Sequence, residues 1–542
     1  MGTPIEAAPH LAPGVVVHRP DTEAGAWIVE RPGTNPLRVG ADAGKLLSAL
    51  DGVLGSEELA TALGEKWTGE LVRGALAKFA GLGLLGTDRN AVAPRERRVV
   101  LLPPAAVQLR LIRATRVLDP LRGLLSRLSG RAVVTTAAVL GAAGLLALAL
   151  QPDVVAGAVA APMTLPAFGW IWIGLVATTV VHELCHGATL THHGGRPGWL
   201  GVMLFYLTPA CFCEVTDGWR LPRRRQRVAI ALAGVSAQAV IGGVAATIAL
   251  LLPSGDTRTT VVGFALACYF IGVLNLVPFI KLDGYLALMA AVDVPHLRDK
   301  AIRDARGWWS RRLFGVRAER QLPRLRWAVP YGMACAAFPV VILTAALTRW
   351  TNVMLAAGFV GAIVVCLLAA YLAYRLLATV FGVLADARRG GASWLRLAAV
   401  VVTGAAALVA VATLVHVPYR IPAGYVADSH GVRLVLPSGT DVTELEPGQR
   451  VVLERGGLFF TTTLGTARVG AGTPVPAEVP VSALLPLRSD IPGHALTLPL
   501  STVDAGGLPE RAGLAHVETG SVSLGTWAGR RYLRPVLAPL FG

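Results

Sequence analysis

Seven long apolar segments dominate the middle of this 542-residue chain. Each is about as long as the helix of roughly 20 residues that crosses the hydrocarbon core of a bilayer. Backbone N–H and C=O groups find no water in that core, so a helix is the form that such segments take. The sequence therefore predicts a polytopic α-helical membrane protein of about seven spans, at residues 132–151, 167–190, 228–252, 260–280, 327–348, 354–380 and 395–416.

Charge is distributed unevenly between the loops that join these segments. The chain is 54% hydrophobic and carries a formal net charge of +16, and its arginines cluster in loops 191–227 and 293–326, whereas loop 152–166 contains neither Lys nor Arg. Basic loops remain in the cytoplasm, which predicts a cytosolic N-terminus and an extracytoplasmic C-terminal region. Because the charge lies beside membrane spans, we expect membrane lipids and no nucleic acid as partners. Arginine greatly outnumbers lysine, which suggests bacterial coding and hence a multi-pass protein of the bacterial cytoplasmic membrane.

Residues 1–92 precede the apolar region and lack the charged-then-apolar pattern of a signal peptide. Short apolar runs at 14–18 and 26–30 predict strands, and amphipathic patterns at 41–50, 56–67 and 69–82 predict helices. Strands followed by three short helices indicate a cytosolic winged-helix-like domain. Such a domain could bind a peptide, bind DNA or be purely structural.

The segment 93–130 is basic, and its apolar residues recur near a 3.6-residue period. These residues are Val107, Leu111, Ala114, Leu118, Leu121, Leu125 and Leu128. The pattern predicts an amphipathic helix that lies on an anionic membrane surface, or else a solvated linker helix. The basic cytosolic loop 293–326, with Trp308 and Trp309, is similarly expected to form an interfacial helix.

Residues 417–542 differ in composition from the apolar region before them. Apolar pieces such as Val432–Leu436 and Arg450–Leu453 alternate with Gly, Pro, Asp and Ser turns. This alternation predicts an all-β domain. The spans at 327–416 separate it from the region 131–292, which carries the chemistry described next.

Two histidines and a carboxylate interrupt the second apolar segment in the sequence HELCH. His182 and His186 stand four residues apart and so share one helix face, where both imidazoles can bind one metal ion. Glu183 can then act as the general base of a hydrolase. Ionisable groups inside an apolar segment are costly, so they indicate function. Asp283, in the sequence NLVPFIKLDG at the end of another span, is the candidate third ligand. Pro278 is expected to end that span, and Gly284 to permit a sharp turn after the ligand.

The pair of motifs, HExxH in one span and NxxPxxxxDG at the end of another, resembles the site-2 protease family of intramembrane zinc metalloproteases. The resemblance covers roughly residues 165–292. It implies one Zn²⁺ per chain bound by His182, His186 and Asp283, with Glu183 as catalytic base. It also implies that Asn275, in the second motif, assists substrate or oxyanion binding.

Further stretches resemble a bacterial branch of that family, the peptide zinc metalloproteases. They include Tyr206–Trp219 and the phrases ALDGVLGSEELATAL and GLGLL, which resemble PqqD-like leader-peptide recognition domains. The C-terminal phrase LEPGQRVVL resembles the barrel-sandwich modules of membrane-fusion adaptors, while LPERAGLAHV echoes a PDZ loop.

Other residues that could bind metal are interpreted as structural. No second Cys/His pair follows Cys211 and Cys213 at ligand spacing, and we expect these thiols simply to pack. His192 and His193 follow the helix end and are expected to be solvated. Glu214 and Asp217 could approach the site on a hairpin, but we expect them to balance nearby arginines.

The residues and the resemblance together predict a zinc metalloendopeptidase. Its expected substrate is a precursor (leader) peptide of a ribosomally synthesised modified peptide, cleaved during maturation or export. Peptide-modification enzymes or a second copy of the chain are further candidate partners. Regulated cleavage of a membrane-anchored signalling protein is one alternative, and a non-proteolytic transport or immunity component with structural zinc is another.

Overall fold

A computed structural model describes most of the chain. The described residues are 9–19, 27–30, 37–64, 66–86, 98–102, 106–205, 208–316, 319–356, 358–429, 431–437, 442–457, 461–485, 487–505, 508 and 511–533. They fall into two compact units. The first consists of Met1–Ala137, Ala177–Gln238 and Leu286–Asp293, and the second of Ala138–Val176, Ala239–Tyr285 and Val294–Gly542.

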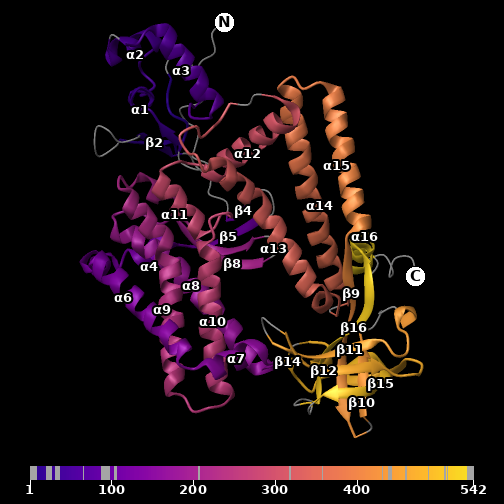
Figure 1. The fold of residues 1–542 in the computed structure, drawn as a ribbon. Coiled ribbons are helices and arrows are strands. Elements are labelled where there is room, and N and C mark those ends of the chain that lie inside the picture. The colour runs from indigo at the N-terminus through magenta and orange to yellow at the C-terminus, as the bar shows by residue number, and fades with distance from the viewer. Residues whose placement is uncertain are drawn as a thin grey trace. The chain divides into compact units, whose positions relative to one another are not determined.

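The first unit opens with a small domain of three strands and three helices (Figure 1). Its antiparallel sheet has the order β1 (Val16–His18), β2 (Trp27–Glu30) and β3 (Leu37–Val39), followed by α1 (Ala41–Ser48), α2 (Ser56–Leu63) and α3 (Gly69–Gly81). Leucines and valines from β2 and all three helices form its core. The side chain of Thr68 caps α3 by accepting from the amide of Leu71. The predicted element order is confirmed, whereas the winged-helix type stays a prediction.

Residues 99–102 and 106–113 form strands, so the amphipathic helix expected over 93–130 is wrong there. The strands β4 (Val99–Leu102) and β5 (Ala106–Arg113) join β7 (Trp199–Phe205) and β8 (Thr208–Cys213) in an antiparallel sheet of order β4-β5-β7-β8. The stretch VQLRLIR at 107–113 mostly alternates apolar and polar residues, a pattern typical of a β-strand paired within a sheet. Only the short helices α4 (Ala114–Leu118) and α5 (Arg122–Arg127) remain of the expected helix.

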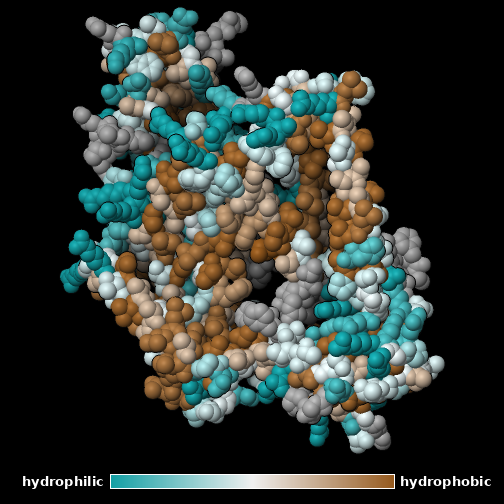
Figure 2. All heavy atoms as spheres, in the orientation of Figure 1, coloured by the Kyte–Doolittle hydropathy of each residue, from teal (hydrophilic) through white to brown (hydrophobic). Residues whose placement is uncertain are grey.

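Seven of the described helices are long and apolar enough to cross a membrane. They are α6 (Gly130–Ala149), α8 (Leu165–His192), α9 (Arg224–Leu251), α10 (Asp256–Leu276), Ala328–Leu347 within α13 (Ala328–Ala356), Ile363–Arg389 within α14 (Gly358–Arg389), and α15 (Trp394–Leu414). On the face shown in Figure 2, hydrophobic residues predominate along α14 and α15, which suits a lipid environment. Their number matches the predicted count of about seven; their placement in a membrane and the sides on which the loops lie stay predictions.

Three shorter helices connect the spans. The helix α7 (Pro152–Ala160) follows α6, and α11 (Asp283–Val292) follows α10. The basic loop 293–326 contains the helix α12 (Leu297–Phe314), as expected. The carboxylate of Asp304 accepts from the amides of Gln321 at 2.6 Å and Leu322 at 3.0 Å, which folds the following segment back onto α12.

The C-terminal part of the second unit is a closed β-barrel, which confirms the predicted β domain. Its strands are β9 (His416–Asp428), β10 (Gly431–Leu436), β11 (Arg450–Gly456), β12 (Thr461–Val469), β13 (Val475–Pro480), β15 (Pro492–Ala505) and β16 (Ala512–Ser523), with α16 (Leu524–Ala528) after them. The order β10-β9-β16-β11-β12-β15 closes because β10 also pairs with β15, and β13 adds to β15. A short parallel pair joins β14 (Leu487–Arg488) to β6 (Met163–Thr164), which precedes α8. Residues 509–510 of the PDZ-like phrase lie outside the described residues, and the resemblances to adaptor modules and to a PDZ loop stay predictions.

The barrel core predicts one large mutational effect. Leu453 on β11 is fully buried, so Leu453→Ala should lower the free energy of unfolding of the barrel by about 2–5 kcal/mol. Val475 on β13 is 57% exposed, and Val475→Ala should change it by less than about 0.5 kcal/mol. Pulse proteolysis of the full chain in a urea series measures both. Equal effects would contradict the position of Leu453 in the core.

Candidate metal centre

His182 and His186 lie one turn apart on α8, and both are buried. Their Nε2 atoms are 3.1 Å apart, and the rings meet edge to face with centroids separated by 4.8 Å. Two ligands at about 2.05 Å from a tetrahedral ion stand about 3.3 Å apart. The two nitrogens are therefore spaced as ligands of one small cation.

The helix α9 orients the second imidazole. The Nδ1 of His186 lies 2.6 Å from the carbonyl oxygen of Ile230, a group that can only accept a hydrogen bond. The ring proton must therefore sit on Nδ1, which leaves the lone pair on Nε2. A carbonyl that fixes the tautomer in this way is the usual companion of a metal-binding histidine.

A glycine on α9 makes room for the first imidazole. A Cβ atom at Gly234 would overlap the ring of His182, at Nε2, Cδ2 and Cε1 alike. Gly234 stands one turn after Ile230, so one face of α9 receives both rings: a carbonyl contacts His186 and a bare backbone contacts His182. The pair of contacts explains how two adjacent imidazoles fit between two packed helices.

Asp283 completes a group of three. One donor atom each from His182, His186 and Asp283 lies within 4.8 Å of the other two. Asp283 is the first residue of α11. Two imidazoles and a carboxylate are a donor set suited to a divalent ion. Among the described residues this is the one group of three or more His, Cys, Asp or Glu side chains that could hold a metal.

Gly284 is needed for a reason other than the one expected. The predicted sharp turn is not there, because Gly284 lies in the first turn of α11 and its φ is not positive. A Cβ atom at this position would instead overlap the backbone of Leu276, the last residue of α10. The glycine therefore allows α11 to begin close against the end of α10. Pro278 follows that end, as predicted.

Glu183 is held by the neighbouring hairpin. Its Oε2 accepts a hydrogen bond of 2.8 Å from the backbone amide of Cys213 on β8. This approach needs Gly187, where a Cβ atom would stand 2.7 Å from Leu118 Cδ1 and 3.0 Å from Cys213 Sγ. The carboxylate predicted to act as base is thus fixed beside an edge strand.

The remaining candidates have structural contacts. Burial raises the pKa of the Cys213 thiol to about 12, with Glu183 and Glu214 adding to the shift, so this thiol stays protonated near neutral pH. His192 is not simply solvated, as was expected, but half-buried: its Nδ1 lies 2.7 Å from the carbonyl oxygen of Leu125, which ties the end of α8 to α5. Asp217 accepts from the amide of Arg196 and from the side chain of Arg220.

Glu214 and Asn275 are not members of the group of three ligands. Glu214 accepts from the amide of Trp199 at 3.2 Å and stands 3.7 Å from the guanidinium of Arg110, so it ties the hairpin together, as its charge-balancing interpretation predicts. Asn275 lies in the last turn of α10. Its part in substrate binding stays a prediction of the resemblance.

Four residues that support the site were not predicted from the sequence. They are Gly187, Ile230, Gly234 and the amide of Cys213. A glycine directly after HELCH was a usable signal for close packing on α8. No pattern in the sequence identified Ile230 or Gly234, because their role depends on which helix packs against α8.

Comparisons with known proteins add no family assignment. No protein-family model matches the chain, and neither a curated protein nor a solved structure matches it. The resemblance to site-2 proteases therefore rests on the residues of this chain alone.

The packing at Gly234 makes a direct prediction. Gly234→Ala should displace the ring of His182 and lower the affinity for Zn²⁺ or Co²⁺ about 10- to 100-fold, the usual effect of disturbing the support of a ligand. Gly169→Ala is the matched control on α8, since a Cβ atom there meets no atom within 4 Å. Chelator competition on the purified protein measures both affinities. An unchanged affinity in Gly234→Ala would contradict the assigned role of this face of α9.

Proposed function

We propose that this protein is an intramembrane zinc metalloendopeptidase. The observation that carries the proposal is the convergence of His182, His186 and Asp283, with Glu183 next to the first ligand and held by β8. Zinc bound by the three residues would polarise a peptide carbonyl and make a water molecule more acidic. Glu183 takes a proton from the attacking water and delivers it to the leaving nitrogen, which completes hydrolysis of the peptide bond.

Edge strand β8 supports a peptide as the substrate. The order β4-β5-β7-β8 places β8 at the border of its sheet. The amide of Glu214 donates to the carbonyl of Trp199, the first residue of β7, whereas the amide of Cys213 donates to Glu183. Alternate residues of a strand face the same way, so the N–H and C=O of Cys211 point to the same side as those of Cys213. An extended peptide paired there would run directly past Glu183.

The N-terminal domain supports recognition of a leader peptide. A groove of about 630 Å³ lies between the start of α1 and α3, lined by residues that include Ala43, Leu71, Gly74 and Phe79. The strand β3, at the edge of its sheet, ends immediately before α1. A peptide strand added to β3 would place its side chains along this groove, whose lining also includes the charged side chains of Asp42, Lys66, Glu70 and Lys78. We therefore propose that a ribosomally made precursor is bound here and cleaved at the zinc site, at the bacterial cytoplasmic membrane with the N-terminal domain in the cytosol.

Catalysis is favoured over a structural metal by the number of ligands. A structural zinc site has four protein ligands, whereas a catalytic site has three and leaves one position for water or substrate. The group that the described residues form has three. A transport component with structural zinc would need a fourth. Cleavage of a signalling protein would use the same centre, and the N-terminal groove is the feature that favours a precursor peptide.

Replacement of Glu183 tests the chemistry. Glu183→Gln removes the proton acceptor but none of the three ligands, so zinc content should stay at one per chain while cleavage falls by about 10²- to 10⁴-fold. The assay uses the protein in liposomes with a synthetic leader-bearing precursor peptide as substrate. His192→Ala, outside the group of ligands, is the control for loss of a histidine. Full cleavage by Glu183→Gln protein would refute the mechanism.

Two matched substitutions test leader recognition. Leu71 is 56% exposed and lines the groove, whereas Val53 is 70% exposed and does not line it. Leu71→Glu should raise the KM for a leader-bearing precursor about 10-fold or more, because a charge would be buried against the peptide, and should leave the KM for a short leaderless peptide unchanged. Val53→Glu should alter neither value. Equal KM values for all three proteins would remove the groove from the proposal.

A further inference from the structure

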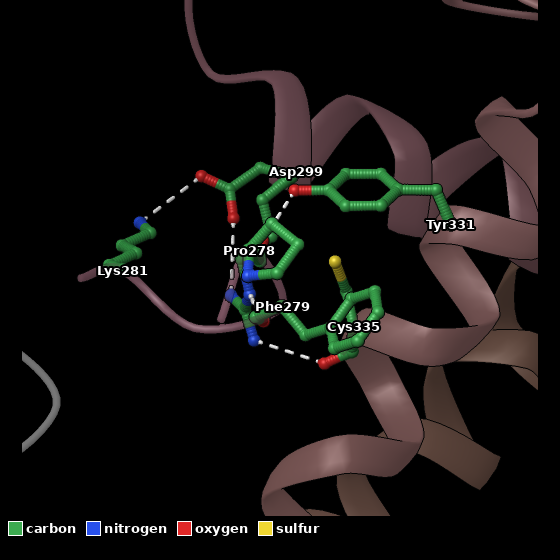
Figure 3. A network of polar contacts seen from close by, with 7 residues as sticks. Pro278, Phe279, Lys281, Asp299, Tyr331 and Cys335 are labelled. Carbon is green, nitrogen blue, oxygen red and sulfur yellow. Dashed lines mark hydrogen bonds and ion pairs between the residues drawn. The ribbon is translucent and has the colours of Figure 1, made fainter. Parts of the chain in front are cut away.

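The link between α10 and the metal ligand Asp283 is bonded to two helices that come later in the chain. Figure 3 shows these contacts. Arg298 on α12 donates from Nε to the carbonyl of Phe279 at 3.1 Å, and from Nη2 to the carbonyl of Cys335 on α13 at 3.4 Å. Tyr331 on α13 donates its hydroxyl to the carbonyl of Pro278 at 2.7 Å. Two successive carbonyls of the link are therefore fixed by side chains.

These contacts lie in a protected place. The side chain of Arg298 is 13% exposed and Tyr331 is 8% exposed, so water competes little for the bonds. Asp299 stands 3.6 Å from the Arg298 guanidinium and offsets its charge. The ring of Phe279 packs against Tyr331 and Phe338, with centroids at 6.1 and 5.5 Å. Polar and aromatic contacts thus hold the same short segment.

The other side of Asp283 is confined as well. Gly284 lies directly against the backbone of Leu276, so α11 cannot shift toward α10. Only Ile280, Lys281 and Leu282 stand between the fixed carbonyl of Phe279 and the ligand Asp283. The amide of Leu282 donates to the carbonyl of Ile280 at 2.8 Å, so this short segment is compact. Movement of the link would therefore be transmitted to the Asp283 carboxylate.

We infer that Arg298 and Tyr331 are positioning residues for Asp283, which set the affinity and geometry of the metal centre through the backbone of Pro278 and Phe279. The inference rests on the proposed metal function of Asp283. It assigns to α12 and α13 a part in the metal site, although neither helix carries a proposed ligand. The basic segment after the two motifs is then a component of the centre as well as a connector.

The test measures metal binding by the full chain in detergent, with Co²⁺ as the probe. Arg298→Ala should lower Co²⁺ affinity about 10- to 100-fold and change the visible spectrum of the bound ion, because the carboxylate ligand is displaced. Tyr331→Phe removes one hydroxyl only and should shift affinity in the same direction, which guards against a simple folding defect. Arg303→Ala, at an exposed position on the same helix, should change affinity less than 2-fold.

A double substitution separates positioning from general stability. In an Asp283→Ala background the ligand is gone, so adding Arg298→Ala should cause no further loss of affinity. The same fold loss in both backgrounds, or unchanged affinity in Arg298→Ala and Tyr331→Phe, would overturn the inference. If Asp283→Ala binds Co²⁺ as tightly as the parent protein, the proposed metal centre itself fails, which is a different result.

Discussion

The hydrogen bond from His186 Nδ1 to the carbonyl of Ile230 is the interaction on which the candidate site depends. It joins α8 to α9, determines which nitrogen of His186 carries the lone pair, and fixes the ring so that its Nε2 meets that of His182. Gly234, one turn further along α9, then has to lack a side chain. The four-residue spacing of the histidines on α8 is matched by the four-residue spacing of their supports on α9.

The sequence predicted the features that depend on one segment alone. Long apolar runs implied the spans, HELCH implied two ligands on one face, and Asp283 followed from the resemblance and the end of α10. The supports could not be predicted, because a carbonyl or a missing Cβ atom matters only once the neighbouring helix is known. Residues 106–113 differ from the prediction for the same reason: the spacing of Val107 and Leu111 suits a helix, but β7 pairs with this segment as a strand.

The residues proposed to bind and use the metal ion are held by segments that are distant from them in the sequence. One carboxylate is held by the hairpin strand β8 and another by a link fixed to α12 and α13. Each ionisable group predicted from the motifs is thus restrained by backbone groups or by side chains outside the motifs. Such restraint is what a preorganised site needs, since misplaced ligands and bases lose most of their effect.

The closed barrel has a consequence for synthesis of the chain. Its last strand, β16, is the neighbour of both β9 and β11, so the ring is incomplete until residues 512–523 have been made. A ribosome that stops before this point releases a barrel with two unpaired strand borders, and such borders recruit other chains. Pairing of residues as distant as Tyr425 and Gly513 is also slow, because a long loop must close first. The barrel therefore forms correctly only if β16 reaches the compartment that holds β9 and pairs there before another chain pairs with the open borders.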